Sequence, residues 1–244
     1  MITGIVVALP EELSTLTSKK LEKGCFEDLT DKTLVIYSGS GWENAHAAAE
    51  LLLAQGASQL ISWGCAAALE ASLRPGDLVL ANSCVDTDNV VFDLNTDWIK
   101  QVQAALSGQL AVRLCTGKLA ESQAIISSSL DKKQIAQKTG AIALDMESTA
   151  IAKVAHKHGL PFLVIRAIAD PLDMNLPAAV SHALNNQGDV VLSKLLRYLL
   201  RHPAELPGLI RLGLHFHAAK HTLKRVAQEI DALTRFNPQN TVTP

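Results

Sequence analysis

The chain has 244 residues, of which 48% are hydrophobic and 19% are charged, and its formal net charge is −2. This composition indicates a packed globular protein rather than a disordered chain, and the near-zero charge gives no case for nucleic-acid binding. The four cysteines are widely spaced and form no CxxC pair, so we expect reduced thiols in a cytoplasmic protein and no zinc site. The N-terminal apolar run is short and lacks a basic region before it, which favours a first strand over a signal peptide.

Strand-like and helix-like segments then alternate along the chain. The expected elements, in chain order, are strands at 2–9 and 33–37, a helix at 44–55, strands at 59–63 and 77–81, a helix at 97–106, strands at 110–115 and 141–144, a helix at 147–158, and a strand at 161–169. Apolar strands interleaved with helices are typical of a parallel sheet that is buried on both faces. We therefore predict an α/β fold, a three-layer sandwich with a central mixed, mostly parallel sheet.

The C-terminal part of the chain has a different pattern. A helix is expected at 190–200, Pro203 and Pro207 interrupt it, and a second helix over 208–233 carries an apolar stripe opposite a basic side. Such a helix either packs its stripe on the core or on a second subunit, or lies on an anionic membrane surface. The expected division is a main domain over 1–200, an amphipathic helical extension over 201–236 and a disordered tail over 237–244.

Three carboxylates fall where the predicted strands end. Asp145 and Glu147 lie between the strand at 141–144 and the next helix, and Asp170 directly follows the apolar strand at 161–169. Ligand sites in open α/β sheets lie at the carboxyl ends of strands, and apolar surroundings raise a carboxyl pKa into the range that suits a general acid. Asp170 followed by proline is equally a turn signal, and Glu147 alone is typical of an acid in a first helical turn.

Glu12 and two glycine-containing segments also have two interpretations each. A proline and two acids at 10–12 make a good helix start, but a glutamate after the first strand would also hold and deprotonate a nucleophilic water. The Ser-Gly-Ser-Gly loop that ends at Gly41 would offer backbone N–H groups to a phosphate or a hydroxyl. Gly64 and Cys65 would let a ligand approach the backbone closely, or would only form a tight turn.

Together these motifs resemble one family. The resemblance rests on five segments: ALPEEL at 8–13, SGSG at 38–41, a strand ending at Gly64, LRPGDLVLA at 73–81, and LDMESTAIAKVAHKHGLPFLVIRAIADP at 144–171. Over residues 1–200 the chain resembles the purine nucleoside phosphorylase and methylthioadenosine/S-adenosylhomocysteine nucleosidase superfamily, which implies that 1–200 is a catalytic domain with the nucleoside phosphorylase-like fold. The part from 176 to 233 resembles the hopanoid-associated phosphorylase branch, which is associated with removing adenine from adenosylhopane.

The resemblance implies a role for each matching residue. Asp170 corresponds to the acid that protonates or hydrogen-bonds purine N7, and Glu147 to the residue that binds the ribose hydroxyls, with Met146 beside the sugar. Glu12 corresponds to the nucleosidase glutamate that positions the attacking water. The backbone of Ile125 would read the adenine edge.

The chain departs from the family pattern at three places. Ala124 stands where the base-lining segment has an aromatic residue, and Ala169 stands where many relatives have a serine beside the acid. The segment at 64–67 replaces a loop richer in glycine and serine. These departures concern the substrate more than the class of reaction.

The expected function is cleavage of the N-glycosidic bond of an adenosine derivative with a bulky apolar 5′ substituent, adenosylhopane, in hopanoid biosynthesis. The alternatives are a methylthioadenosine/S-adenosylhomocysteine nucleosidase, a general purine nucleoside phosphorylase, and, from a different class, a non-catalytic Rossmann-like nucleotide-binding module. The last is disfavoured because Asn44 stands at the third glycine position of GxGxxG.

The expected partners and co-substrates follow from the same interpretation. No metal or redox cofactor is required, and inorganic phosphate is an open co-substrate: Glu11 and Glu12 favour water, whereas the branch name favours phosphorolysis. We expect a small-molecule nucleoside as the ligand, with a lipid-linked nucleoside as one option, and a homodimer or higher homo-oligomer. The expected location is the cytoplasm, with the C-terminal helix as a candidate for peripheral contact with the inner face of the membrane.

Overall fold

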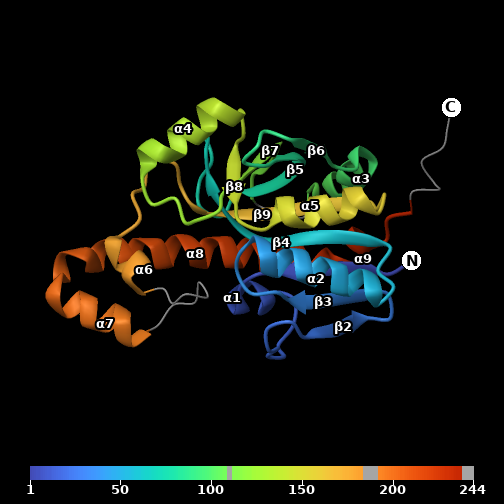
Figure 1. The fold of residues 1–244 in the computed structure, drawn as a ribbon, viewed down its shortest axis with the longest axis horizontal. Helices are drawn as coiled ribbons and strands as arrows, with labels where there is room; N and C mark the ends of the chain where they lie inside the picture. Colours follow the sequence, from blue (N-terminus) through green and yellow to red (C-terminus); the bar gives the residue numbers. More distant parts are fainter. Residues whose placement is uncertain (109–111, 184–191, 238–244) are drawn as a thin grey trace.

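The computed structural model describes residues 1–108, 112–183 and 192–237 (Figure 1). The strands are β1 (Thr3–Val7), β2 (Phe26–Thr30), β3 (Thr33–Tyr37), β4 (Gln59–Ala68), β5 (Leu78–Val85), β6 (Val91–Asp93), β7 (Leu114–Glu121), β8 (Ala143–Asp145) and β9 (Phe162–Asp170). The helices are α1 (Pro10–Leu13), α2 (Trp42–Ala54), α3 (Thr96–Leu106), α4 (Ser129–Thr139), α5 (Ser148–Lys157), α6 (Ala178–Ala183), α7 (Leu192–Arg201), α8 (Leu206–Val226) and α9 (Ile230–Thr234).

Within the described residues these strands form one sheet. Its order is β2-β3-β1-β4-β8-β7-β5-β6, and β9 pairs with both β4 and β5. The pairs β1–β3, β1–β4, β4–β9, β5–β7 and β7–β8 are parallel. The predicted mixed, mostly parallel sheet is therefore confirmed. The double pairing of β9 closes β4, β8, β7, β5 and β9 into a ring, which the sequence pattern does not indicate.

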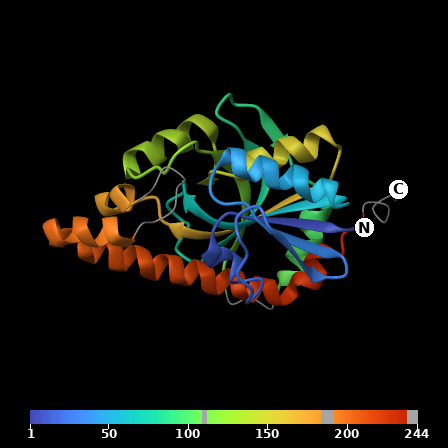
Figure 2. The same ribbon diagram turned by 60° about the horizontal axis from the view of Figure 1, so that its bottom comes forward.

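Helices cover the sheet on both sides. α2 and α5 pack against each other and contact β1 and β4, whereas α8 packs along β9. Figure 2 shows α2 and α5 on one side of the sheet and the long α8 on the other. The centre lies between β4 and β9, where most side chains are apolar and nearly all are buried. Arg166 is a charged exception in β9, and its burial requires a counter-charge nearby.

Some predicted boundaries are wrong. β4 does not end at Gly64 but continues to Ala68, because the glycine serves a close approach of side chains rather than a turn. The strand expected at 110–115 instead runs over Leu114–Glu121, whose side chains are mostly half-buried and give no continuous apolar run; residues 109–111 lie outside the described part. The edge strands β2 and β6 and the helix α4 were not expected, because β2 and α4 are largely polar and β6 is only 3 residues long.

The C-terminal helices divide into a packed part and an exposed part. The second half of α8 buries Ala219, Leu223 and Val226, and the backbone of Leu233 beyond it accepts a hydrogen bond from Nε1 of Trp98 at 2.8 Å. Towards the other end, α7 and the start of α8 project from the body (Figure 1). Among the described helices, none is long and apolar enough to cross a membrane. The tail predicted at 237–244 lies, except for Asn237, outside the described residues.

Candidate active site

Glu12 is held by two backbone N–H groups. Its Oε1 accepts a hydrogen bond from the N–H of Cys65 at 2.7 Å, and its Oε2 accepts one from the N–H of Leu9 at 3.1 Å. The second contact is the glutamate half of a capping box at the start of α1, so the helix-start interpretation applies, while the first contact joins the same side chain to β4. Glu12 is only 3% exposed. Burial raises the pKa of its carboxyl group, and the charge of Arg166 acts against that rise.

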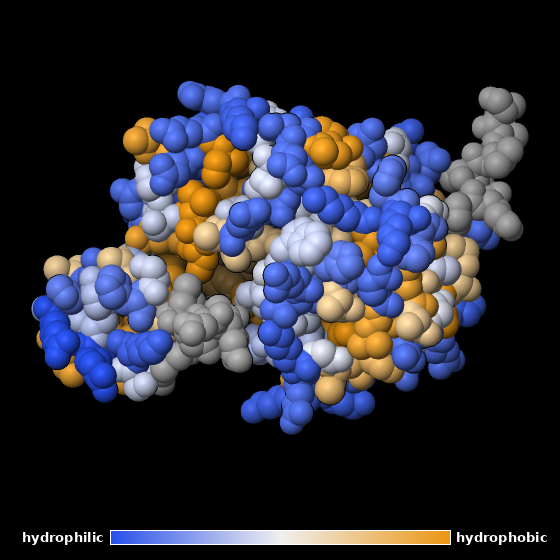
Figure 3. Space-filling view, in the orientation of Figure 1, coloured by the Kyte–Doolittle hydropathy of each residue, from blue (hydrophilic) through white to orange (hydrophobic). Residues whose placement is uncertain are grey.

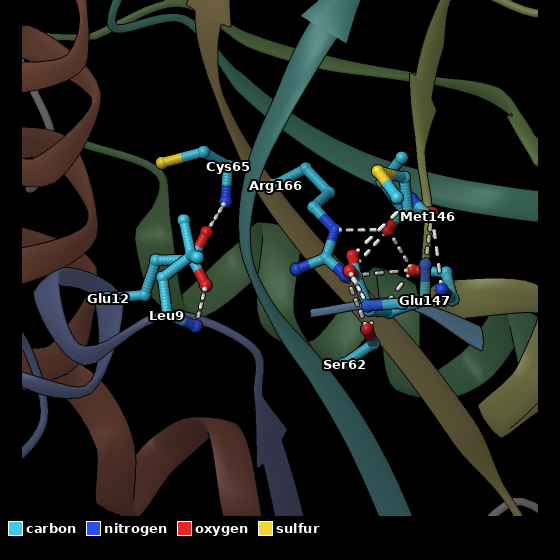
Figure 4. Close-up of polar contacts among 10 residues, drawn as sticks. Leu9, Glu12, Ser62, Cys65, Met146, Glu147 and Arg166 are labelled. Carbon is cyan, nitrogen blue, oxygen red and sulfur yellow. Dashed lines mark hydrogen bonds and ion pairs between the residues drawn. The ribbon is translucent and has the colours of Figure 1, made fainter. Parts of the chain in front are cut away.

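Gly64 allows this arrangement because it has no side chain. A Cβ atom at position 64 would lie 2.6 Å from Oε1 of Glu12 and 2.6 Å from Nη1 of Arg166. β4 therefore passes directly beside the carboxylate and the guanidinium, as the close-up shows (Figure 4). Any larger residue at this position would push the two charged groups out of place.

Glu147 reaches across to a second glycine. Although it precedes α5 as its N-cap, its side chain makes no cap hydrogen bond. Instead, Oε1 accepts a hydrogen bond from the N–H of Gly41 at 2.8 Å. Gly41 has a φ of 97°, which an L residue rarely adopts. Burial, with a smaller contribution from the charge of Asp145, raises the pKa of Glu147 to about 7, and Arg166 acts in the opposite direction.

Arg166 links several residues of the site through its hydrogen bonds. Its Nε donates to Oδ2 of Asp145 at 2.6 Å, and its Nη2 donates to Oγ of Ser62 at 2.6 Å and to Oγ of Ser148 at 3.1 Å. Figure 4 shows the guanidinium between Glu12 on one side and the residues around Glu147 on the other. The sequence interpretation did not assign Arg166 a role. A single arginine within an apolar strand was the signal that could have identified it.

Asp170 lies at the end of β9 and has its own ion pair. Nζ of Lys132 lies 2.7 Å from Oδ2 of Asp170, and the Lys132 side chain is fully buried. Among the described residues, Oδ1 of Asp170 is buried and has no hydrogen-bond partner. Burial raises the pKa of Asp170; Lys132 lowers it, and Asp173 adds a smaller rise. Lys132 was also missed by the sequence interpretation, because α4 was not expected.

The remaining predicted residues lie around this centre. Met146 is partly buried, and its N–H donates to Oε2 of Glu147 at 3.3 Å. Gly41, Met146 and Gln123 line a cavity of about 760 Å³ together with other residues, whereas neither Glu12 nor Asp170 lines it. This cavity brings the predicted sugar-binding residues next to the predicted base-lining segment.

Ile125 lies on the loop between β7 and α4 and is 42% exposed. This loop is tied to the segment that follows Asp170: the N–H of Leu176 donates to the carbonyl of Ser127 at 2.8 Å. In the strand register, Asp170 stands opposite Ala67 of β4. The structure therefore gathers Glu12, Gly64, Cys65, Gly41 and Glu147 around Arg166, and it places Asp170 and the Ile125 loop beside each other.

Comparison with known proteins assigns the family. Residues 3–202 match the sequence model of the Phosphorylase superfamily. The chain belongs to this superfamily. A 5′-methylthioadenosine/S-adenosylhomocysteine nucleosidase from Staphylococcus aureus (strain JH9) is 26% identical in an alignment of length 196 that covers 68% of this chain and 85% of the relative. The expectation of an enzyme of the nucleoside phosphorylase and nucleosidase type is confirmed.

Solved structures share the fold. A Helicobacter pylori 5′-methylthioadenosine/S-adenosylhomocysteine nucleosidase superposes with a TM-score of 0.70 at 18% identity, over 95% of this chain and 96% of that one. The nucleosidase from Neisseria meningitidis gives 0.70 at 20% identity, over 94% and 98%. The futalosine hydrolase of Helicobacter pylori strain 26695 gives 0.68 at 18% identity, over 95% and 96%. The expected sandwich architecture is thereby confirmed.

Proposed function

We propose that this enzyme cleaves the N-glycosidic bond of an adenosine derivative and releases adenine. The proposal rests on the different surroundings of two sets of carboxyl groups. Asp170 is buried, and one of its oxygens has no partner within the described part of the chain, whereas Glu12 and Glu147 flank a buried arginine and point their oxygens at backbone N–H groups. The names of the relatives, methylthioadenosine/S-adenosylhomocysteine nucleosidases and a futalosine hydrolase, support the same reaction.

Asp170 would activate the leaving group. When the bond between the sugar and the base breaks, the electron pair goes to the purine, and a proton on N7 neutralises it. A buried carboxyl group with a raised pKa keeps its proton to higher pH and suits this role. General-acid assistance of this kind contributes ~10²–10⁴-fold to a rate.

Glu147 would hold the sugar while it becomes positively charged. As a carboxylate it accepts hydrogen bonds from two hydroxyl groups, one of its oxygens already being fixed by Gly41 at 2.8 Å. Its negative charge, like that of Glu12, also lies where the oxocarbenium-like sugar develops positive charge. Such preorganised charge stabilises the transition state more than the ground state.

Water is the nucleophile that this arrangement favours. The N–H groups of Gly41 and Cys65, which an incoming phosphate would need, already bind the carboxylates of Glu147 and Glu12. The nearby cation, Arg166, is paired with Asp145. A phosphate dianion would therefore meet negative charge, and these two donors would not be free to bind it. Glu12, buried and with a raised pKa, would accept the proton of the attacking water.

The finer part of the proposal is a bulky apolar 5′ substituent, of which adenosylhopane is the candidate. Figure 3 shows a hollow with apolar walls between α4 and the α6–α7 end of the molecule. Five large apolar residues are exposed on α7 and α8: Leu196, Leu200, Leu206, Ile210 and Leu214. Arg197 and Arg201 are exposed beside them, a combination that suits an anionic membrane surface carrying a lipid-linked substrate.

One assay tests the reaction and its finer parts. Adenine release would be measured from adenosine, from methylthioadenosine and from an adenosyl-lipid in vesicles, each with and without phosphate. We expect release without phosphate, a sugar with a free hydroxyl group at C1′ that keeps its 5′ substituent as the second product, and the highest kcat/KM with the adenosyl-lipid. Absence of release from all three substrates would refute the function, and a strict requirement for phosphate would refute hydrolysis.

A further inference from the structure

Lys132 is a fully buried lysine on a helix whose other side chains are exposed or only partly buried. α4 is polar, and Lys132 is its buried residue, with 0% exposure. Lysine is almost never fully buried unless its charge is paired. Nζ lies 2.7 Å from Oδ2 of Asp170 and 2.9 Å from the carbonyl oxygens of both Pro171 and Met174. These three acceptors match the three N–H donors of an ammonium group.

We propose that Lys132 is the positioning residue of the leaving-group acid: it holds Oδ2 of Asp170 together with the backbone that follows, and so leaves Oδ1 to carry the proton and deliver it to the base. The inference rests on the proposed function. A proton on Oδ2 would compete with the ammonium donor for the same oxygen. Oδ1, in contrast, is buried without a partner among the described residues and keeps its hydrogen-bonding capacity.

In the proposed step, Asp170 gives its proton to the base. The proton moves from Oδ1 of Asp170 to a purine ring nitrogen, the bond between the sugar and the base breaks, and its electron pair goes to the base. Asp170 is left as a carboxylate beside the charge of Lys132 at 2.7 Å. Lys132 therefore stabilises the product of the transfer and makes Asp170 a stronger acid than burial alone would allow.

Other charged groups near Asp170 act more weakly. Asp173, on the segment after β9, raises the pKa of Asp170, against the effect of Lys132. From the neighbouring elements, the charged or titratable residues that line a cavity with Asp173 are Arg74, Lys133, Arg211 and His215. Lys132, in contrast, is in direct contact with the carboxylate of Asp170.

The test compares Lys132→Met with Lys132→Arg and with Lys133→Met, which removes one positive charge from an exposed neighbouring position. The readout is the pH profile of kcat/KM for adenine release. Since an adjacent opposite charge lowers a carboxyl pKa by about 1–3 units, the alkaline limb should move up by about that amount in Lys132→Met. Because Asp170 becomes a weaker acid, kcat should fall by roughly tenfold or more. Lys132→Arg should keep most of the activity, with the alkaline limb of its pH profile at the wild-type position. Lys133→Met should have the activity and the pH profile of the wild type.

A second measurement needs no turnover. The carboxyl carbon of Asp170 would be titrated by ¹³C NMR in the wild type and in Lys132→Gln, which also replaces the methionine variant if that one does not fold. An Asp170 titration that stays at the same pH, or an alkaline limb that does not move, would overturn the role of Lys132. If the wild type releases no adenine but the titration moves, the proposed function fails while the control of Asp170 by Lys132 stands.

Discussion

Nε of Arg166 donates a hydrogen bond of 2.6 Å to Oδ2 of Asp145, and both side chains are buried. The same guanidinium also acts on the charges of Glu12 and Glu147. One cation therefore lies close to three carboxyl groups, so the centre can carry more negative than positive charge. This balance fits a reaction in which a sugar becomes positively charged, and it makes the site dependent on a single arginine.

Replacing Arg166 by methionine should destabilise the fold strongly. The change leaves Asp145 buried beside Ser62 and Ser148 without its counter-charge, and losing one partner of a buried ion pair costs about 3–5 kcal/mol. Urea unfolding followed by circular dichroism measures this free energy. Arg74→Met, at an exposed position, should change it by less than about 0.5 kcal/mol. Equal unfolding midpoints for the two variants would contradict the central role of Arg166.

Gly41→Ala should impair activity beyond its effect on stability. Gly41 has a φ of 97°, so alanine strains the backbone whose N–H holds Glu147, although its Cβ would meet no atom within 4 Å. Gly24→Ala is the matched control, since Gly24 has a φ of 81°, equally open surroundings and an exposed position in a different loop. Both variants should lose about 1–2 kcal/mol of stability. Only Gly41→Ala should raise KM for the nucleoside; a similar KM in both variants would argue against the contact with Glu147.

Much of this fold was predictable because its central strands are apolar. The segments at 33–37 and 161–169 were found almost to the residue, since continuous apolar runs between turn signals leave little choice. The exposed strands β2 and β6 and the polar helix α4 carry no such pattern. Their positions depend on tertiary contacts, and the closure of the sheet through β9 depends on pairing that no local segment specifies.

The sequence allowed the carboxylates of the candidate site to be predicted but not its cations. Glu12, Glu147 and Asp170 stand beside motifs with a recognisable order, and the structure places them at strand and helix ends. Arg166 lies within the recognised segment at 144–171 but had no predicted role, and Lys132 lies outside the recognised segments; each is identified by its buried contact with a carboxylate. Such pairs join residues from separate elements, which periodicity along one segment cannot reveal.

Nucleoside affinity should fall as pH decreases through about 7. Burial and Asp145 raise the pKa of Glu147 from 4.5 to about 7, so below that pH the group is protonated and accepts hydrogen bonds from ribose hydroxyls less well. Calorimetric titration with a C-nucleoside analogue, whose base is not released, measures this affinity against pH. Glu147→Gln should bind weakly and without that pH dependence.

The raised pKa of Glu147 also makes the stability of the folded protein depend on pH. Because the folded protein holds the Glu147 proton more tightly than the unfolded chain, this group lowers stability as pH rises from 4.5 to about 7. Glu147→Gln should lose less stability over that range than the wild type. Parallel stability curves for the two proteins would show that Glu147 does not titrate as described.

Two exposed leucines should matter for a lipid substrate and not for a soluble one. Leu200 is 86% exposed on α7 and Leu214 is 65% exposed on α8. In a variant with both changed to serine, release from an adenosyl-lipid in anionic vesicles should fall by about tenfold or more, because burying even one such side chain in lipid contributes about 1.5–3 kcal/mol. Release from methylthioadenosine should not change. Leu130→Ser, at a 62% exposed position on α4, is the control, and an equal loss in that variant would refute membrane docking through α7 and α8.

Glu12→Gln should nearly abolish hydrolysis. Both oxygens of Glu12 accept backbone N–H groups, from Cys65 at 2.7 Å and from Leu9 at 3.1 Å. A glutamine must turn its NH₂ group towards one of these donors, which removes a hydrogen bond and also removes the base that takes the proton from water. We expect kcat to fall by ~10²–10⁴-fold, measured as the sugar with a free C1′ hydroxyl group that hydrolysis forms, whereas Glu11→Gln at the exposed neighbouring position should leave it unchanged. If Glu12→Gln instead kept its rate when phosphate was added, phosphate and not water would be the nucleophile.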